Sequence, residues 1–330
     1  MPKKEIFRDF SALSKLNQQH SDTQIEKKQK VGNTDRQCPN IGWLFYKDYY
    51  NGLQQNWLVK NPGKEVKENT ESYFEKKNTH LQNAPYSLIN ARSVFKGISN
   101  ICFELFTIYP GLLIGSGGSH ETGLIGEIKL GFQFDYTTGL PYIPASSVKG
   151  MLRSMFPYSL RVKKKADELK KEIIFYRKKR SEYISTICKE LKDDTGRLFT
   201  FDDGCELNLS DEEVKKLELS IFEGVDGEDK ALAIRDRDLF FDALVVETKG
   251  KLLGLDFITP HKDSIKSPNP IQFLKVLPEV KFRFSFRLRN TELGKNRCFT
   301  EKMKKMLFKR ILEDIGLGAK TNVGYGQFRK

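Results

Sequence analysis

The chain has 330 residues, with 56 Lys and Arg against 43 Asp and Glu, so its formal net charge is +13 at pH 7. A hydrophobic share of 38% and a charged share of 30% are typical of a globular protein and exclude a fibrous or disordered one. No run approaches the roughly 18 apolar residues of a membrane span, and the charged start is unlike a signal peptide. We therefore expect a cytoplasmic protein with no membrane partner, whose positive charge favours an anionic partner such as nucleic acid.

Cysteine and histidine are too widely spaced to predict a disulfide framework or a local metal site. Neighbouring cysteines lie at least 17 residues apart, and no H-E-x-x-H motif occurs. We expect reduced thiols, no metal and no cofactor. The residues concerned are Cys38, Cys102, Cys188, Cys205, Cys298, His20, His80, His120 and His261.

Residues 1–95 are predicted to form a helical and aromatic N-terminal extension. The first 40 residues are polar, whereas residues 40–58 concentrate aromatic side chains and hold both tryptophans. We interpret that stretch as a helix packed on a core, although a base-stacking platform would use the same residue types.

The remaining residues, 96–330, are predicted to form one α+β domain. Strands alternate apolar and polar residues or are apolar throughout, whereas helices repeat apolar residues every three or four positions. The order βαββαβ that results is that of the ferredoxin-like (RRM-like) fold, with one sheet face left available. The elements are a strand over 98–109 buried on both faces, a helix over 146–156, a strand over 238–247, a strand over 281–289 with a basic outer face, a helix over 300–315 and a strand over 322–328.

Two segments interrupt this core. Residues 160–230 are predicted to be a large charged helical insertion, in which 161–180 hold ten Lys or Arg and three acids. That basic run is either a solvated helix face or a contact for RNA or a partner. Residues 249–273 contain several prolines and few regular features, so we expect an excursion out of the sheet.

No residue is predicted to be catalytic. His120, in the glycine-rich SGGSHETG, is able in principle to deprotonate a ribose 2′-hydroxyl, which would make the chain a metal-independent RNA endonuclease. A histidine in such a loop more often supports the backbone. Asp135, Asp238 and Asp242 are interpreted as turn or packing carboxylates rather than as metal ligands.

The passage LPYIPASSVKGMLRS, residues 140–154, is the first candidate RNA contact. Its turn brings Ser146 and Ser147 to a helix start, where free backbone N–H groups and the helix dipole favour an anion. Lys149 and Arg153 are four residues apart and add positive charge. The alternative is that Ser146 caps the helix and both cations are solvated.

The passage LGAKTNVGYGQF, residues 317–328, is the second. Its glycines would let the main chain approach a sugar-phosphate backbone, with a lysine to neutralise charge. The alternative is a tight turn between helix and strand. The residues proposed to contact RNA here are Lys320, Thr321 and Asn322, which lie among Gly318, Gly324 and Gly326.

Together these two passages resemble the RAMP superfamily of CRISPR-associated RNA-binding proteins. Within it, the stretches GLLIGSGG, FFDALVVE and PNPIQFLKV are similar to the sixth-subunit family of Cmr-type (type III-B) effector complexes. The likeness covers about residues 95–328. Ala145 departs from the glycine that commonly precedes the paired serines.

This resemblance implies a non-catalytic subunit of an antiviral ribonucleoprotein. Such a subunit would hold guide CRISPR RNA near its 3′ end and contact target RNA, neighbouring RAMP subunits and the small subunit. Target cleavage would belong to the repeated backbone subunit. By the same likeness, residues 249–273 would form a thumb-like projection against the guide–target duplex.

Overall fold

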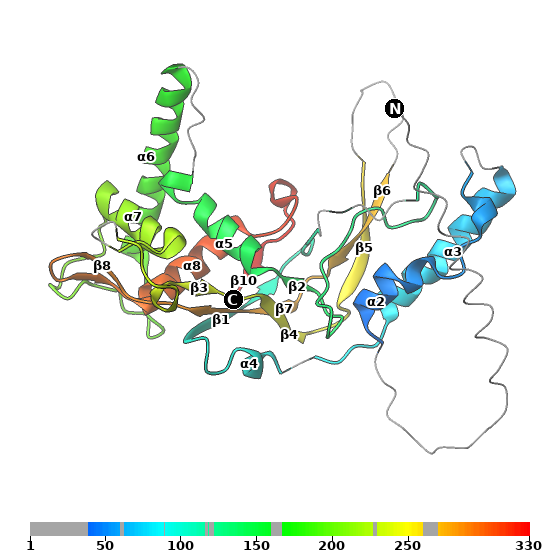
Figure 1. Ribbon diagram of the computed structural model, residues 1–330, viewed down its shortest axis with the longest axis horizontal. Coiled ribbons are helices and arrows are strands. Elements are labelled where there is room, and N and C mark those ends of the chain that lie inside the picture. The colour runs from blue at the N-terminus through cyan, green and yellow to red at the C-terminus, as the bar shows by residue number, and fades with distance from the viewer. Residues whose placement is uncertain are drawn as a thin grey trace, which may run out of the picture. The chain divides into compact units, whose positions relative to one another are not determined.

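The computed structural model describes most of the chain from residue 39 onward. Contacts divide the chain into two units, 1–37 and 38–330, and the first lies outside the described residues. All described helices and strands belong to the second unit (Figure 1). The described residues are 39–59, 63–88, 90–115, 118, 122–159, 167–226, 230–259 and 270–330.

An antiparallel sheet forms the centre of the second unit. Its strands follow the order β10-β1-β7-β4-β2, and β3 also pairs with β7. Along the chain, β1, α5, β4, β7, α8 and β10 reproduce the predicted βαββαβ order, so the α+β class is confirmed. The bounds are β1 (Ile101–Thr107), β2 (Tyr142–Ile143), β3 (Leu239–Phe240), β4 (Ala243–Thr248), β7 (Val280–Arg287), β10 (Phe328–Arg329), α5 (Ala145–Ser154) and α8 (Glu301–Ile315).

Two predicted strands differ from the structure by more than a few end residues. The strand expected over 238–247 is broken at Phe241 and Asp242 into β3 and β4, which pair with successive parts of β7. The break turns the Asp242 carboxylate toward α5, where it accepts the Ala145 N–H at 2.7 Å. The strand expected over 322–328 is reduced to β10, because a 3₁₀ turn and glycine turns occupy the residues before it.

The helices α5 and α8 contact one another and cover one face of the sheet. The predicted alternation of β7 is confirmed, since its phenylalanines are buried against α8. Thr300 accepts the Met303 N–H at 3.3 Å and so begins α8, and Gly316 ends it as predicted. The buried residues at this interface are Phe103, Phe282, Phe284, Phe286, Leu307, Phe308, Ile311 and Leu312.

The other sheet face carries the basic residues of β7, as predicted, but two of its charges are compensated within the chain. Lys281 pairs with Glu247, and Arg283 pairs with Glu104 at 2.8 Å. Ser285, expected to point outward, is buried. The strand β1 is not buried on both faces either: its alternate residues are only half-buried. A short helix, α4 (Ala91–Val94), contacts β4.

The aromatic stretch after residue 40 belongs to the hydrophobic core. It forms α2 (Ile41–Tyr46), which is followed by α3 (Lys64–Asn83). Phe45, Tyr49 and Phe74 are fully buried, and the tilted rings of Phe45 and Phe74 pack on Tyr49 with centroids 6.1 and 5.2 Å from it. Their cluster is continuous with the core under the sheet, which supports the helix-on-core interpretation over a base-stacking platform.

The predicted excursion leaves the central sheet but is more regular than expected. Strands β5 (Leu253–Ile258) and β6 (Ile271–Val276) form a separate antiparallel hairpin, and most of the residues between them lie outside the described part. The hairpin contacts α3 and bridges back to Leu112 through Val276. The prolines of this segment, at 260, 268 and 270, lie between two strands of six residues each, which the sequence analysis did not predict.

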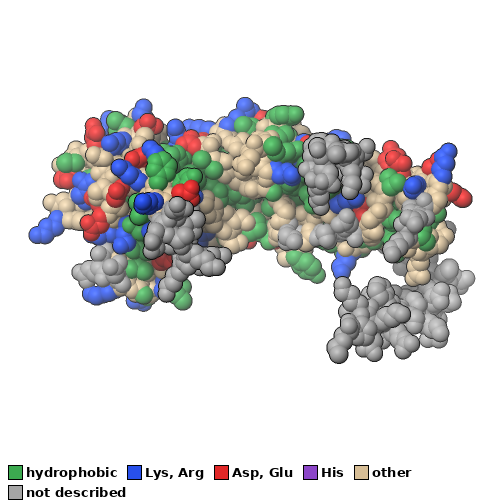
Figure 2. Space-filling model, turned by 90° about the horizontal axis from the view of Figure 1, so that it is seen from above, with side chains coloured by type: hydrophobic (Ala, Val, Ile, Leu, Met, Phe, Trp, Pro, Cys, Tyr) green, Lys and Arg blue, Asp and Glu red, His purple; other side chains and the backbone are tan. Residues whose placement is uncertain are grey.

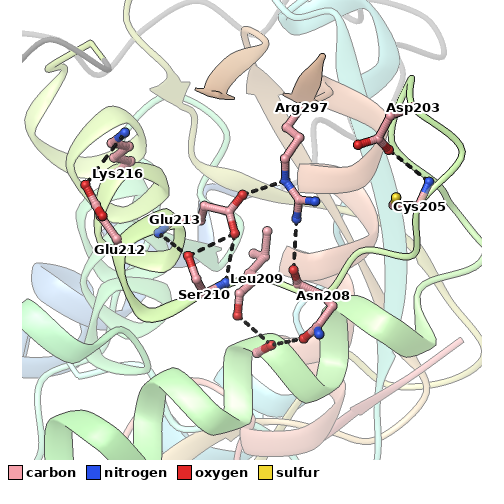
Figure 3. A network of polar contacts seen from close by, with 10 residues as sticks. Asp203, Cys205, Asn208, Leu209, Ser210, Glu212, Glu213, Lys216 and Arg297 are labelled. Atoms are coloured by element: carbon pink, nitrogen blue, oxygen red, sulfur yellow. Dashed lines mark hydrogen bonds and ion pairs between the residues drawn. The ribbon is translucent and has the colours of Figure 1, made fainter. Parts of the chain in front are cut away.

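The segment between α5 and β3 is helical, as predicted. It contains α6 (Asp167–Glu190) and α7 (Asp211–Glu218), and the hairpin of β8 (Thr291–Gly294) and β9 (Arg297–Phe299) packs against α7. Figure 3 shows the polar contacts that connect α7 with β9. Ser210 and Glu213 cap the start of α7 reciprocally, and Arg297 of β9 donates to Glu213 at 2.6 Å. Within the described residues no helix is long and apolar enough to cross a membrane.

A buried ion pair joins α8 to the start of β3. The Lys304 amine lies 2.5 Å from Asp238, and both side chains are at most 1% exposed. Asp238 also accepts the Arg289 N–H at 2.6 Å. Burial raises the pKa of Asp238 and lowers that of Lys304, so each charge is costly unless its partner is present.

We therefore expect Lys304→Met to destabilise the protein by about 3 to 5 kcal/mol, because it leaves the Asp238 charge buried without its cation. Urea unfolding measures this difference. Lys305→Met is the matched control: its partner Asp194 is 80% exposed, so about 1 kcal/mol or less is expected. Equal losses in the two variants would contradict the role given to the buried pair.

Candidate nucleic-acid interface

The start of α5 offers fewer free N–H groups than the sequence suggests. The helix begins at Ala145, with Pro144 rather than Ser146 as its N-cap residue. The Ala145 N–H donates to Asp242, and the Ser147 N–H donates to the Pro144 carbonyl at 2.9 Å. Ser146 and Ser147 are exposed. A phosphate at this helix end would therefore meet two hydroxyl groups, with the Asp242 carboxylate close by.

Lys149 and Arg153 have different surroundings although both lie on α5. The Lys149 amine lies 5.6 Å from the centroid of the Phe240 ring, where a cation–π contact is favourable. Arg153 forms an ion pair with Glu223, at the end of the π-helical turn that follows α7. The charge of Arg153 is thus compensated within the chain, which makes Lys149 the stronger candidate for a phosphate contact.

The glycines of the second passage serve first to fold the loop itself. Gly326 has φ of 72°, and a Cβ at this position would lie 1.9 Å from the Leu317 carbonyl oxygen, so no side chain fits. The Leu317 N–H donates to the Gly326 carbonyl, and the Gly326 N–H donates to the Gly111 carbonyl, both at 2.8 Å. A tight turn between helix and strand, the alternative interpretation, accounts for these contacts.

The tip of that loop points to solvent. Lys320 is exposed and adopts the left-handed conformation with φ of 63°, and a 3₁₀ turn over Thr321–Val323 follows it. The Val323 N–H donates to the Lys320 carbonyl at 3.1 Å, which closes the turn. Asn322 is also exposed. The tip therefore presents a cation and an amide on a backbone fixed by internal hydrogen bonds.

A polar cluster that the sequence analysis missed anchors this loop to the β5–β6 hairpin. The Tyr325 hydroxyl and the Lys275 amine each donate to the Asp256 carboxylate at 2.6 Å. Burial alone would raise the pKa of Asp256, but these two hydrogen bonds outweigh it and the pKa lies below its ordinary value. The sequence signal for this cluster was Tyr325, a tyrosine between two glycines. Its hydrogen-bond partner Asp256 is distant in the sequence and could not be predicted from it.

The two candidate passages lie on the same side of the central sheet. Figure 1 shows α5, α8 and the loop after α8 on one side of the strands, with α4 on the other. Among the described residues, no hydrogen bond or ion pair connects α5 with the loop tip. Each passage is instead held separately, α5 by Asp242 and the loop by Gly111 and Asp256.

The other candidate residues have structural partners or lie outside the described residues. His120 belongs to the latter group. Asp135 accepts hydrogen bonds from Thr137 and Thr138, Asp238 pairs with Lys304, and Asp242 caps α5, which agrees with their interpretation as turn and packing carboxylates. Within the described part of the chain, no group of three or more His, Cys, Asp or Glu is placed to hold a metal ion.

A family model described as the RAMP superfamily matches residues 104–329, a span that includes both candidate passages and the central sheet except the first three residues of β1. The chain therefore belongs to the RAMP superfamily.

Among curated proteins, the chain is similar to two subunits named Cmr6. One is the CRISPR system Cmr subunit Cmr6 of Pyrococcus furiosus, 29% identical over 221 residues, which are 57% of this chain and 58% of that protein. The other is the CRISPR system CMR subunit Cmr6 of Saccharolobus solfataricus, 24% identical over 276 residues, or 82% and 68% of the two chains. The chain thus matches less than two thirds of the length of the Pyrococcus furiosus relative.

Two chains of solved structures are also similar to this chain. One is a chain of the cryo-EM structure of the type III-B Cmr-beta bound to cognate target RNA, with 22% identity, 88% and 86% of the two chains covered and a TM-score of 0.47. Another is the crystal structure of Cmr6 from Pyrococcus furiosus, with 23% identity, 70% and 97% coverage and a TM-score of 0.35.

A buried carboxyl group lies beside Arg153. Glu218 of α7 is 2% exposed, and it accepts the Tyr158 N–H at 2.8 Å. Burial raises the pKa of Glu218 to about 7, although that hydrogen bond and the nearby guanidinium of Arg153 act in the opposite direction. In the folded protein this group therefore keeps its proton up to a pH at which the unfolded chain has released it.

The stability of the protein should consequently depend on pH through Glu218. The folded pKa of about 7 lies above the unfolded value of 4.5, so the contribution is fully present below pH 4.5 and is lost as the pH rises through 7. As the pH rises between these limits, we expect the free energy of unfolding of Glu218→Gln to increase by up to about 3 kcal/mol relative to wild type. Urea unfolding at several pH values measures this difference. Glu212→Gln, on the exposed side of α7, is the matched control. A pH-independent difference would contradict this assignment.

Proposed function

We propose that this chain is a non-catalytic RNA-binding subunit of a type III-B CRISPR effector complex. In that complex it holds the guide RNA near its 3′ end and contacts neighbouring RAMP subunits. Membership of the RAMP superfamily and similarity to proteins named Cmr6 support this proposal. The observation that carries it is the exposed tip at Lys320, on a glycine-folded loop inside the region that the family model matches.

The chemistry of the loop tip suits a guide RNA. A guide contains a spacer of variable sequence, so a subunit that holds it needs contacts to phosphate and sugar, which carry no base information. An ammonium group at Lys320 and an amide at Asn322 supply such contacts. The loop is already ordered by its contacts to Gly111 and Asp256, so less conformational entropy is lost when RNA binds.

The proposed RNA-contacting residues differ in exposure and in whether their side chains already have partners within the chain. Ser146 and Ser147 expose hydroxyl groups, and Lys149 holds its charge over an aromatic ring. Arg153 must exchange its ion pair with Glu223 for a phosphate, so we expect it to contribute less. The full set is Ser146, Ser147, Lys149, Arg153, Lys320, Thr321 and Asn322.

Other parts of the fold have proposed places in the same assembly. The sheet with α5 and α8 would be the ferredoxin-like RAMP core, and the β5–β6 hairpin the thumb-like projection against the guide–target duplex. The Tyr325–Asp256 hydrogen bond would then connect the guide contact at the loop to the thumb. Partners in this proposal are guide RNA, target RNA, neighbouring RAMP subunits and the small subunit.

We expect Lys149→Ala and Lys320→Ala each to weaken binding of guide RNA. Each substitution removes about one phosphate contact, so the salt dependence of log K should fall by about 0.7 per variant and by about 1.4 in the double variant. Filter binding at several salt concentrations measures both quantities. Lys67→Ala/Lys76→Ala on α3 removes two exposed charges elsewhere and is the matched control. An unchanged salt slope in the Lys149/Lys320 double variant would reject this site.

The proposal that this chain does not cleave RNA can be tested separately. Labelled guide-precursor RNA incubated for hours with the purified protein, with EDTA or with Mg²⁺, should stay intact. Cleavage in EDTA that disappears in His120→Ala would replace the proposed function by a metal-independent endonuclease.

A further inference from the structure

Three large apolar residues in succession are exposed on α6. Ile174, Phe175 and Tyr176 expose 64%, 57% and 54% of their surfaces. Figure 1 shows this part of α6 extending beyond α7, and no described element covers it. Exposed runs of this kind are disfavoured on a solvated helix, because water contacts with apolar surface cost free energy, and they mark a contact surface.

Cations surround this apolar run. Residues 169–180 contain six Lys or Arg and one Glu. Lys178 and Lys179 are exposed, and the Lys179 amine lies 5.8 Å from the centroid of the Phe175 ring and 3.1 Å from the Glu182 carboxylate. Figure 2 shows hydrophobic, basic and acidic side chains intermixed at the left end of the molecule, the end at which Figure 1 shows α6. The Phe175 and Tyr176 rings meet edge to face with centroids 5.7 Å apart and form one exposed strip of the helix with Lys179, whereas Lys178 lines the neighbouring cleft.

A cleft of about 300 Å³ opens beside the strip. The Arg177 guanidinium lies 4.9 Å from the centroid of the Tyr158 ring, and the Lys215 amine lies 5.5 Å from it. The one carboxylate of the lining, Asp211, accepts the Ser181 hydroxyl. The cleft therefore has apolar walls and a cationic side. Its lining residues are Pro157, Tyr158, Ile174, Arg177, Lys178, Ser181 and Asp211.

We propose that α6 carries a second binding surface for single-stranded RNA, formed by Phe175, Tyr176, Lys178 and Lys179. Bases stack on the two exposed rings, Lys179 exchanges its ion pair with Glu182 for a phosphate beside them, and Lys178 contacts a phosphate at the cleft. The cleft beside Ile174 accommodates a neighbouring nucleotide. This inference takes its ligand from the proposed function, but it depends on residues that are separate from the α5 and loop contacts.

The composition of the strip favours RNA over a protein partner. The centres of protein interfaces are depleted of lysine, whereas surfaces that bind single strands combine a cationic track with aromatic rings. Each face of a base is a π surface, so stacking on Phe175 and Tyr176 tolerates any sequence. A guide or target strand of variable sequence is therefore suited to this surface.

The first test is photo-crosslinking of the full chain to a short oligouridylate. Trypsin cleaves after Lys171 and after Arg177, so both stacking residues fall in the peptide of residues 172–177. We expect a uridine adduct on this peptide in the mass spectrum. Adducts on other peptides in its absence would overturn the inference, whatever the stability of any variant.

The second test compares binding of the same oligouridylate by paired variants. Phe175→Ala/Tyr176→Ala should weaken binding about tenfold with little change in salt slope, because stacking is lost and no charge is removed. Lys178→Ala/Lys179→Ala should lower the salt slope by about 1.4. Tyr136→Ala, at an exposed aromatic side chain, and Lys67→Ala/Lys76→Ala are the matched controls and should bind like wild type.

The outcomes separate this inference from the proposed function. If both α6 variants bind like wild type while the Lys149/Lys320 double variant binds more weakly, α6 is not an RNA surface and the proposed function stands. The reverse result supports α6 and rejects the α5 and loop assignment. Loss of co-assembly with neighbouring subunits at unchanged RNA affinity would identify the strip as a protein contact and overturn the inference.

Discussion

The ion pair between Asp238 and Lys304 fixes the elements on which both candidate RNA contacts depend. Asp238 immediately precedes β3, and Lys304 lies in the first turns of α8, so the pair sets how α8 lies on the sheet. Asp242, at the break after β3, then accepts the first N–H of α5. A single buried charge pair thus defines the position of one helix, and the strand beside it fixes the start of the other.

From α8, contacts continue to the hairpin without interruption. Gly316 ends the helix, the Leu317 and Gly326 backbones bond to one another, and Gly326 bonds to Gly111. Tyr325 then reaches Asp256 of β5. Since each contact is a hydrogen bond between ordered groups, displacement of the loop tip would be transmitted to the hairpin.

The sequence predicted the elements better than it predicted their electrostatic surroundings. Local periodicity was enough for α5, for α8 and for the buried phenylalanines of β7. The charges of Lys281, Arg283 and Arg153 were equally visible, but their partners Glu247, Glu104 and Glu223 come from distant segments. A one-dimensional pattern does not show which charges neutralise one another, so the partners of these cations on the sheet face and on α5 could not be predicted. The β5–β6 hairpin was missed for a related reason, because its pairing is made within a proline-rich segment.

The loop also separates positions that can vary from positions that cannot. At Gly326 any β-carbon would overlap a carbonyl oxygen, so no other residue is tolerated at this position. Three residues earlier, Val323 exposes 68% of its surface, and a substitution there meets no obstacle. The spacing of the glycines should therefore be conserved in divergent members of the superfamily even where the residues between them change. That spacing is then a better indicator of distant homology than overall sequence identity.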